Sequence, residues 1–142
     1  MNAKKYLIQE YQYWKYLILA YLTHNDIKCK LPKDIKIGHG CIGTIISKRV
    51  KFGSNCRIRS CTNIGTPKEY DTGSNWVIIG NNVDIGVKTS IMNCSHGDLV
   101  IGDNVVIGAG SMVFSSVPSN TKVYGIWDKH GILKCSACCK AK

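Results

Sequence analysis

The sequence predicts an all-β solenoid, a fold in which short strands and turns repeat along one axis. Aliphatic or aromatic residues recur every six positions in four runs, and glycine directly follows many of them. Six is neither the period of a helix face, which is three to four residues, nor the two-residue period of a single strand. It suits a short strand plus a turn, used repeatedly. The repeated positions are Leu31 and Ile37; Ile46, Phe52, Ile58 and Ile64; Ile79, Ile85 and Ile91; and Ile101, Ile107 and Val113.

A smaller residue precedes most of these positions by two. Residues i and i−2 of a strand point to the same side, so each repeat is expected to supply one large and one small inward side chain. Asparagine and glycine between the repeats suit turns that need a positive φ angle. The small residues are Val50, Cys56, Thr62, Val83, Thr89, Val105 and Ser111, and the turn asparagines are Asn55, Asn81, Asn82 and Asn104.

Three insertions interrupt the six-residue frame. Residues in excess of the frame must leave the coil as loops, and such loops often carry function. The longest predicted loop, 65–76, has the polar composition of an exposed segment. The interrupted intervals are nine residues from Ile37 to Ile46, fifteen from Ile64 to Ile79, and ten from Ile91 to Ile101.

The first 25 residues predict a separate element, a short amphipathic α-helix. Its apolar face is expected to cover the first coil or to pack against another subunit. The longest apolar run there, 16–22, is too short to span a bilayer, so a membrane role is disfavoured. We therefore expect a helix over 1–25, a solenoid domain over 26–126 and a basic tail over 127–142. The helix pattern comes from Tyr6, Leu7, Tyr11, Trp14, Leu17, Ile18, Tyr21 and Leu22, at three- and four-residue spacing.

Charge and cysteine content narrow the partners only in part. The chain has 142 residues and a formal net charge of +10, which attracts anions such as a phosphate-rich cofactor, nucleic acid or a membrane. Nucleic-acid binding is disfavoured because no basic motif interleaved with aromatic residues is present. No export signal is recognised, so the eight cysteines are expected to be reduced and the protein cytoplasmic.

Two blocks of the repeat, 79–86 and 101–110, resemble the hexapeptide-repeat acyltransferase family. The resemblance covers about residues 26–126. It implies a left-handed parallel β-helix with three hexapeptides per triangular coil, a homotrimer, and acetyl-CoA as the acyl donor. The left hand is implied by the resemblance alone, because it runs against the usual right-handed crossover.

His39 is the candidate catalytic residue. The segment 37–46 resembles the active-site segment of serine acetyltransferases and of colanic-acid-type polysaccharide O-acetyltransferases, although one extra residue separates His39 from the aliphatic run. A neutral imidazole can accept the proton of an alcohol that attacks a thioester. The alternative is a histidine on the surface of the helix. An acidic residue is expected to orient the base; Asp26 is the first candidate, two residues closer than the family spacing, and Asp34 is the second.

The same resemblance implies a cofactor groove between neighbouring subunits. Backbone groups at Gly86, Val87, Ala109, Gly110 and Ser111 are expected to line it. Small residues there would let an extended pantetheine arm lie against the backbone. Lys122 and Lys129 are candidates for contacts with the cofactor phosphates.

These residues predict an enzyme that moves an acetyl group from acetyl-CoA to a hydroxyl of a sugar, a polysaccharide precursor or a small metabolite. Serine O-acetylation is the alternative; it is disfavoured because the loop 65–76 has no second histidine and the N-terminal region is short. A non-catalytic β-helical scaffold is the alternative from another class. No metal is expected, because the four histidines lack the spacing of zinc ligands. His96 is expected in a surface loop, and Cys135, Cys138 and Cys139 in a tail with free thiols.

Overall fold

The computed structural model describes residues 25–67, 75–94, 97–129 and 131–133. The predicted N-terminal helix lies outside the described residues, as do His96 and the three cysteines of the tail. The described elements are β1 (Asp26–Ile27), β2 (Lys36–Ile37), the 3-10 turn η1 (His39–Cys41), β3 (Ile45–Ile46), β4 (Val50–Phe52), β5 (Arg57–Ile58), β6 (Asn63–Gly65), β7 (Val77–Ile79), β8 (Asp84–Ile85), β9 (Ser90–Met92), β10 (Leu99–Ile101), β11 (Val106–Ile107), β12 (Met112–Val113), β13 (Lys122–Val123), β14 (Ile126–Asp128) and β15 (Gly131–Leu133).

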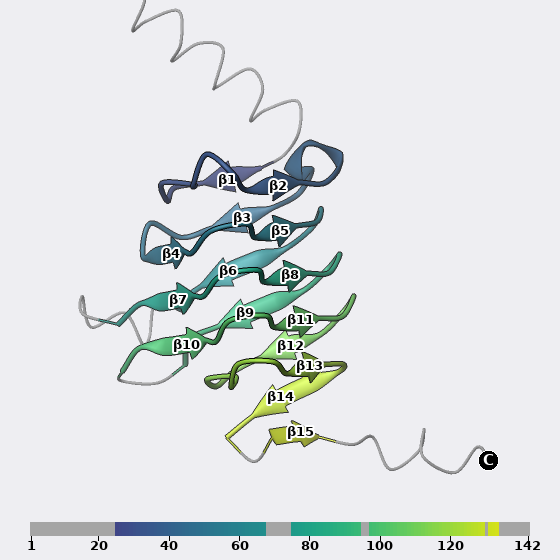
Figure 1. Ribbon diagram of the computed structural model, residues 1–142. Coiled ribbons are helices and arrows are strands. Elements are labelled where there is room, and N and C mark those ends of the chain that lie inside the picture. Colours follow the sequence, from purple (N-terminus) through teal and green to yellow (C-terminus); the bar gives the residue numbers. More distant parts are fainter. Residues whose placement is uncertain (1–24, 68–74, 95–96, 130, 134–142) are drawn as a thin grey trace, which may run out of the picture.

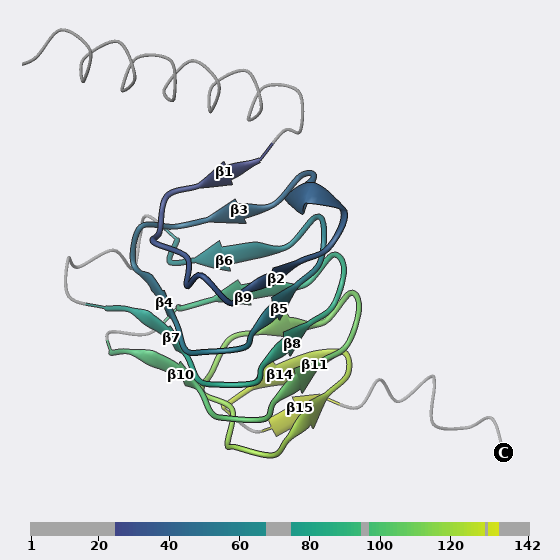
Figure 2. The same cartoon turned by 45° about the horizontal axis from the view of Figure 1, so that its top comes forward.

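The strands form a β-helix with triangular coils, which confirms the all-β solenoid (Figures 1 and 2). Sheet A has the order β1-β3-β6-β9-β12-β14-β15, sheet B the order β13-β11-β8-β5-β2, and sheet C the order β10-β7-β4. All pairs are parallel except β14 with β15. Each complete coil visits sheets A, C and B in turn, so consecutive strands belong to different faces.

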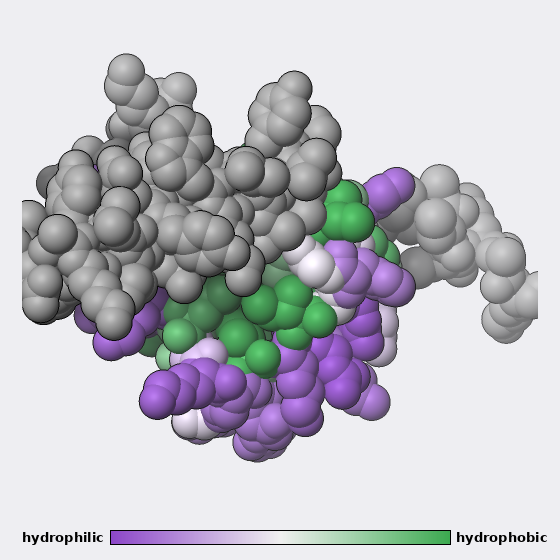
Figure 3. Space-filling model, turned by 90° about the horizontal axis from the view of Figure 1, so that it is seen from above, coloured by the Kyte–Doolittle hydropathy of each residue, from purple (hydrophilic) through white to green (hydrophobic). Residues whose placement is uncertain are grey.

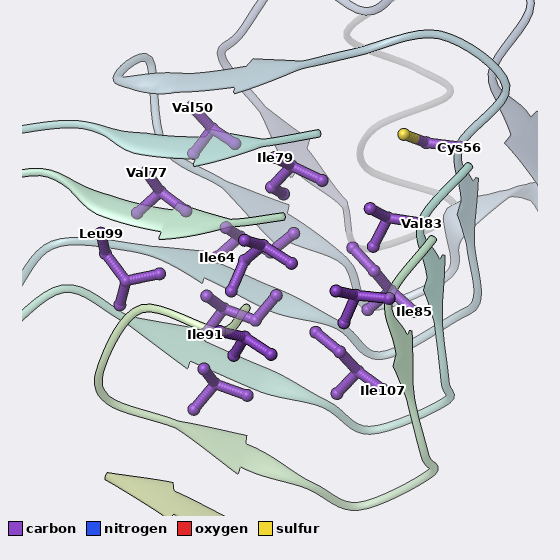
Figure 4. Close-up of a cluster of buried hydrophobic side chains, with 14 of the residues drawn as sticks. Val50, Cys56, Ile64, Val77, Ile79, Val83, Ile85, Ile91, Leu99 and Ile107 are labelled. Atoms are coloured by element: carbon purple, nitrogen blue, oxygen red, sulfur yellow. The ribbon is translucent and has the colours of Figure 1, made fainter. Parts of the chain in front are cut away.

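The six-residue repeat becomes columns of stacked side chains. In sheet A, Ile46 pairs with Ile64, Ile64 with Ile91, and Ile91 with Val113. All four are at most 1% exposed, and Figure 4 shows side chains of this core pointing into the space between the sheets. The predicted large inward positions are thereby confirmed for sheet A, and the register of sheets B and C repeats the pattern.

The smaller inward positions are also confirmed, and their polar members are hydrogen-bonded. Thr62, Thr89 and Ser111 are fully buried. The Thr62 hydroxyl donates to the carbonyl of Arg59 at 2.8 Å, and the Thr89 hydroxyl donates to that of Gly86 at 2.9 Å. These bonds offset the cost of removing hydroxyl groups from water.

The corner between sheets C and B carries an asparagine ladder. Asn55, Asn82, Asn104 and Asn120 have φ angles of 55–60°. Their side-chain amides donate from each coil to the next at 2.9, 3.1 and 3.0 Å. Asn81, also expected in a turn of positive φ, instead accepts the Ser54 backbone N–H at 2.8 Å.

The insertions leave the coil at corners, and the strands resume in register afterwards. Residues 38–44 protrude at the corner from sheet B to sheet A. The other two insertions fall between a strand of sheet A and a strand of sheet C, β6 and β7 in one case and β9 and β10 in the other. Sheet A also continues past residue 126, where a tail was expected to begin. Trp127 pairs with Val113, and its indole N–H donates to the carbonyl of Ser116 at 3.1 Å.

Candidate active site

His39 lies at the corner from sheet B to sheet A, at the start of the 38–44 insertion. Gly38 continues the strand ladder, since its N–H donates to the carbonyl of Ile58 at 2.9 Å. His39 then turns the chain with a φ of 50°, and Gly40 follows at 63°. The His39 side chain is exposed. The ring is therefore accessible to a ligand at this corner.

The same corner carries the candidate cofactor residues in lower coils. The residues equivalent to Gly38 in the next three coils are Arg59, Gly86 and Gly108. Each N–H donates to the carbonyl of the residue just before its equivalent in the next coil: Gly38 to Ile58, Arg59 to Ile85 and Gly86 to Ile107. The residue after each of these forms the next row, which holds His39, Ser60, Val87 and Ala109. Successive coils are about 4.8 Å apart. The base candidate and Ala109 thus lie on one edge of the prism, three coils apart.

The residues at the lower end of this row differ in exposure and in the space around them. A Cβ at Gly110 would meet no atom within 4 Å, and Ala109 is exposed. Ser111 is fully buried and its hydroxyl faces the interior, so its side chain cannot reach a groove ligand. Val87 is half-buried. Open space and small side chains leave room for an extended ligand along this edge, although the Gly110 N–H already donates to the Val87 carbonyl at 2.8 Å.

At Gly86 there is no room for a side chain between neighbouring coils. A Cβ at this position would lie 2.5 Å from the amide nitrogen of Ala109 and 2.7 Å from the carbonyl carbon of Gly108. The residue itself is buried. Gly86 therefore allows the coils to stack, whatever it does for a ligand.

Sequence reasoning missed two exposed side chains at this corner, those of Cys61 and Lys88. Both have φ angles near 57°, like Gly110 at 70°, and the Lys88 N–H donates to the carbonyl of Ser60 at 3.1 Å. Cys61 lies below the insertion, where a Cβ at Gly43 would be 3.3 Å from its sulfur. Following the frame through the inserted loops would have found both, since they are the turn residues that match Gly110.

Arginine adds positive charge next to His39. A Cβ at Gly38 would lie 3.6 Å from Cγ of Arg59, so this side chain runs directly below the residue before His39. Asp84 fixes the guanidinium with Nη1 to Oδ1 at 2.9 Å, and it also lies 3.5 Å from Arg57. Together with Lys88, these arginines make the corner attractive to an anionic group.

The structure places the two acidic candidates differently. Asp26 lies at the start of sheet A and its N–H donates to the carbonyl of Thr44, at the end of the insertion that carries His39. Its carboxylate pairs with Lys28 Nζ at 2.8 Å rather than with the imidazole. Asp34 lies at the corner with the asparagine ladder, where its carboxylate accepts the Asn55 N–H at 2.6 Å. Of the two, only Asp26 is at the corner of His39.

Lys122 and Lys129 do not meet the other candidates within one chain. Lys122 begins β13 on the outer face of sheet B, and Lys129 follows β14 at the corner from sheet A to sheet C. Lys129 lines a hollow of about 420 Å³ together with Cys94, Asp98 and Ser115. A second hollow of about 390 Å³ runs along sheet A with Asp26 at its edge. Neither hollow contains His39, so contacts of these lysines with a donor at the His39 corner would need a second subunit.

Burial raises the pKa of three thiols near the upper coils. The pKa of Cys29 rises to about 11, and the pKa values of Cys41 and Cys56 are also raised by loss of hydration. These thiols stay protonated and unreactive at neutral pH. Within the described part of the chain, no group of three histidine, cysteine or acidic side chains could hold a metal ion, and no helix is long and apolar enough to cross a membrane.

Comparison with known proteins identifies serine acetyltransferases among the relatives of this chain. The chain is 37% identical over 98 residues to serine acetyltransferase of Synechococcus elongatus, and 40% identical over 98 residues to that of Staphylococcus epidermidis. Over these residues the chain resembles the hexapeptide-repeat acetyltransferases. This confirms the family resemblance and, with it, the left-handed β-helix. No family model matches the chain.

Solved structures of serine acetyltransferases share the hexapeptide-repeat fold. The chain matches that of Neisseria gonorrhoeae in complex with serine with a TM-score of 0.56 and 32% identity, over 65% of this chain and 35% of that one. It matches serine acetyltransferase 1 of Entamoeba histolytica in complex with L-cysteine with a TM-score of 0.62 and 25% identity, over 74% and 40%. In sequence, the match covers 68% of this chain but only 37% and 43% of the two bacterial relatives. The hexapeptide-repeat chain thus spans about two fifths of the length of these curated relatives.

Proposed function

We propose that this protein transfers an acetyl group from acetyl-CoA to a hydroxyl group, with His39 as the general base. The observation that carries the proposal is the shared edge of the β-helix. His39, Ser60, Val87 and Ala109 follow one another in a single row at the corner from sheet B to sheet A, and a Cβ at Gly110 would meet no atom within 4 Å. The similarity to serine acetyltransferases over 98 residues supports this chemistry.

The residues suggest how the transfer would proceed. The His39 imidazole takes the proton of the acceptor hydroxyl as its oxygen attacks the thioester carbonyl. The new C–O bond forms, the C–S bond breaks, and the imidazolium returns its proton to the CoA thiolate. The donor would lie along the corner over Ala109 and Gly110. Arg59 and Lys88 supply positive charge for its phosphate groups, and Asp26 is the nearest acidic candidate for orienting the base.

Serine is the first acceptor to test, because the relatives are named serine acetyltransferases. One observation favours a second class, a sugar or polysaccharide precursor: the loop 65–76 contains no histidine, unlike the corresponding loop that the family resemblance implies for serine acetyltransferases. A release assay for free CoA with serine, amino sugars and oligosaccharides separates the two.

We also propose a homotrimer in the cytoplasm. Sheet A exposes Ile45, Met112 and Ile126 on its outer face, at 48%, 40% and 39%. Met112 and Ile126 are neighbours in this row, whereas Ser90 and Asn63 separate them from Ile45. Exposed apolar side chains of this kind suit a contact between subunits. Light scattering that shows an active monomer at micromolar concentration would exclude the trimer.

The decisive experiment compares His39→Ala with His96→Ala, the latter in a segment without family support. Loss of the base should lower kcat by about 10²–10⁴-fold while acetyl-CoA binding stays nearly unchanged. If His39→Ala keeps most of the activity, the base is another residue. If the wild-type protein shows no activity with any acceptor, the result favours the non-catalytic scaffold.

A further inference from the structure

The N-terminal end of the β-helix exposes side chains that belong to its interior. Ile37 is 44% exposed, whereas Ile58, its partner in the next coil, is fully buried. In the same first coil, Ile27, Cys29 and Ile35 pack against the core but are only partly buried. Figure 3 looks down on this end and shows apolar surface bordered by polar surface where the end is visible. Each coil of a solenoid is covered only by its neighbours, so the first coil needs a cap.

The strand edges at this end are open as well. Among the described strands, β1 ends sheet A and β2 ends sheet B, each with a partner on one side only. An uncovered strand edge invites pairing with another chain. A cap would therefore protect both apolar side chains and backbone groups.

The chain itself supplies a segment of suitable length and pattern. Residues 4–22 carry apolar side chains at helical spacing and end three residues before β1, the first strand of the exposed coil. As a helix, these 19 residues would be about 28 Å long. The short connection keeps the segment at this end at high effective concentration, which favours it over a separate partner or a membrane.

We propose that residues 4–22 form an amphipathic helix that lies across the open end and caps the first coil. Its face with Leu7, Trp14 and Ile18 packs on Ile37 and its neighbours. Gln12 points away, because it lies about 120° from Ile18 around a helix of 3.6 residues per turn. This inference does not depend on the proposed enzymatic activity.

The test compares two full-length variants that introduce the same charge, Ile18→Asp on the capping face and Gln12→Asp on the opposite face. Ile18→Asp should lower Tm by about 5–10 °C and speed amide exchange in residues 26–46, with residues 99–113 unaffected. Gln12→Asp should leave both within about 1 °C and twofold. Equal effects of the two variants would overturn the proposal.

A double-mutant cycle tests the contact itself. Ile37→Ser should lower Tm in the wild-type background but have a smaller effect in Ile18→Asp, because the cap is already displaced there. Additive effects would overturn the proposal, since residues that do not share an interface act independently. The proposal would also be overturned if Ile18→Asp changed only the particle mass, which would assign the segment to a contact with another subunit. The same holds if Ile18→Asp changed only the binding to anionic vesicles, which would assign the segment to a membrane.

Discussion

Gly86→Ala tests whether this glycine serves coil stacking or ligand binding. The added Cβ would lie 2.5 Å from the amide nitrogen of Ala109, about 0.9 Å short of the 3.4 Å at which ordinary contact begins. Its other near atoms, the carbonyl carbon of Gly108 and the carbonyl oxygen of Ile107, also belong to the backbone. No side chain can rotate away, so two coils must separate. Such overpacking costs about 3 kcal/mol, which corresponds to a Tm lower by about 6–12 °C.

Gly97→Ala is the matched control. A Cβ there would meet no atom within 4 Å, and no positive φ is present to strain it. Its Tm should stay within about 2 °C or rise slightly, because alanine restricts the unfolded chain. Differential scanning fluorimetry without ligand gives both values. A Gly86→Ala variant that melts like Gly97→Ala would refute the stacking argument, and a loss of acetyl-CoA binding alone would give Gly86 a purely ligand-binding role.

Three further outcomes are expected. Saturating acetyl-CoA at a hundredfold over Kd should raise Tm by about 5–10 °C, and Ala109→Trp should abolish this shift, whereas Val100→Trp on sheet C should keep it. Cys61, exposed at the same corner, should react with maleimide faster than the buried Cys41 and Cys56, and bound acetyl-CoA should slow this reaction. Peptide mass mapping measures the labelling. If acetyl-CoA does not protect Cys61, the donor binds at another place. Between pH 9 and 11 Tm should fall more steeply in wild type than in Cys29→Ala, because the unfolded thiol ionises near 9 while burial holds the folded pKa at about 11; equal slopes would show that Cys29 is hydrated.

The fold was predictable because the interior of a β-helix repeats. Ile46, Ile64 and Ile91 occupy equivalent positions in successive coils, so the same steric requirement recurs along the sequence. The loops were predictable for the same reason: residues that exceed the frame cannot enter a column without shifting every side chain that follows. The end of the solenoid was less predictable. Trp127 continues sheet A although the six-residue repeat has stopped: it pairs with Val113, and its indole N–H donates to the Ser116 carbonyl.

The candidate site was predictable only in part, because it depends on contacts between coils. The periodicity gives the corner of each residue but not the direction of its side chain. Ser111 was expected at a groove, yet it occupies the inward position of the repeat and its hydroxyl is buried. Asp34 was an alternative partner for His39, yet it accepts the Asn55 N–H at another corner. Lys88 was missed because the loop 66–76 hides its equivalence with Gly110 and Cys61.

The two strand-free corners on either side of sheet B place the same demand on the backbone but meet it differently. Both repeat a residue with φ near 60°. At one corner every such residue is asparagine, and the side chains bond to one another from coil to coil. At the other corner the equivalent residues are Cys61, Lys88 and Gly110, which form no such ladder among the described residues. Asparagine would satisfy the backbone there equally well. The corner that gives up this stabilisation is the one that carries His39. Its backbone N–H groups still donate from coil to coil, as Gly110 does to Val87 at 2.8 Å, but its exposed side chains stay available for a ligand.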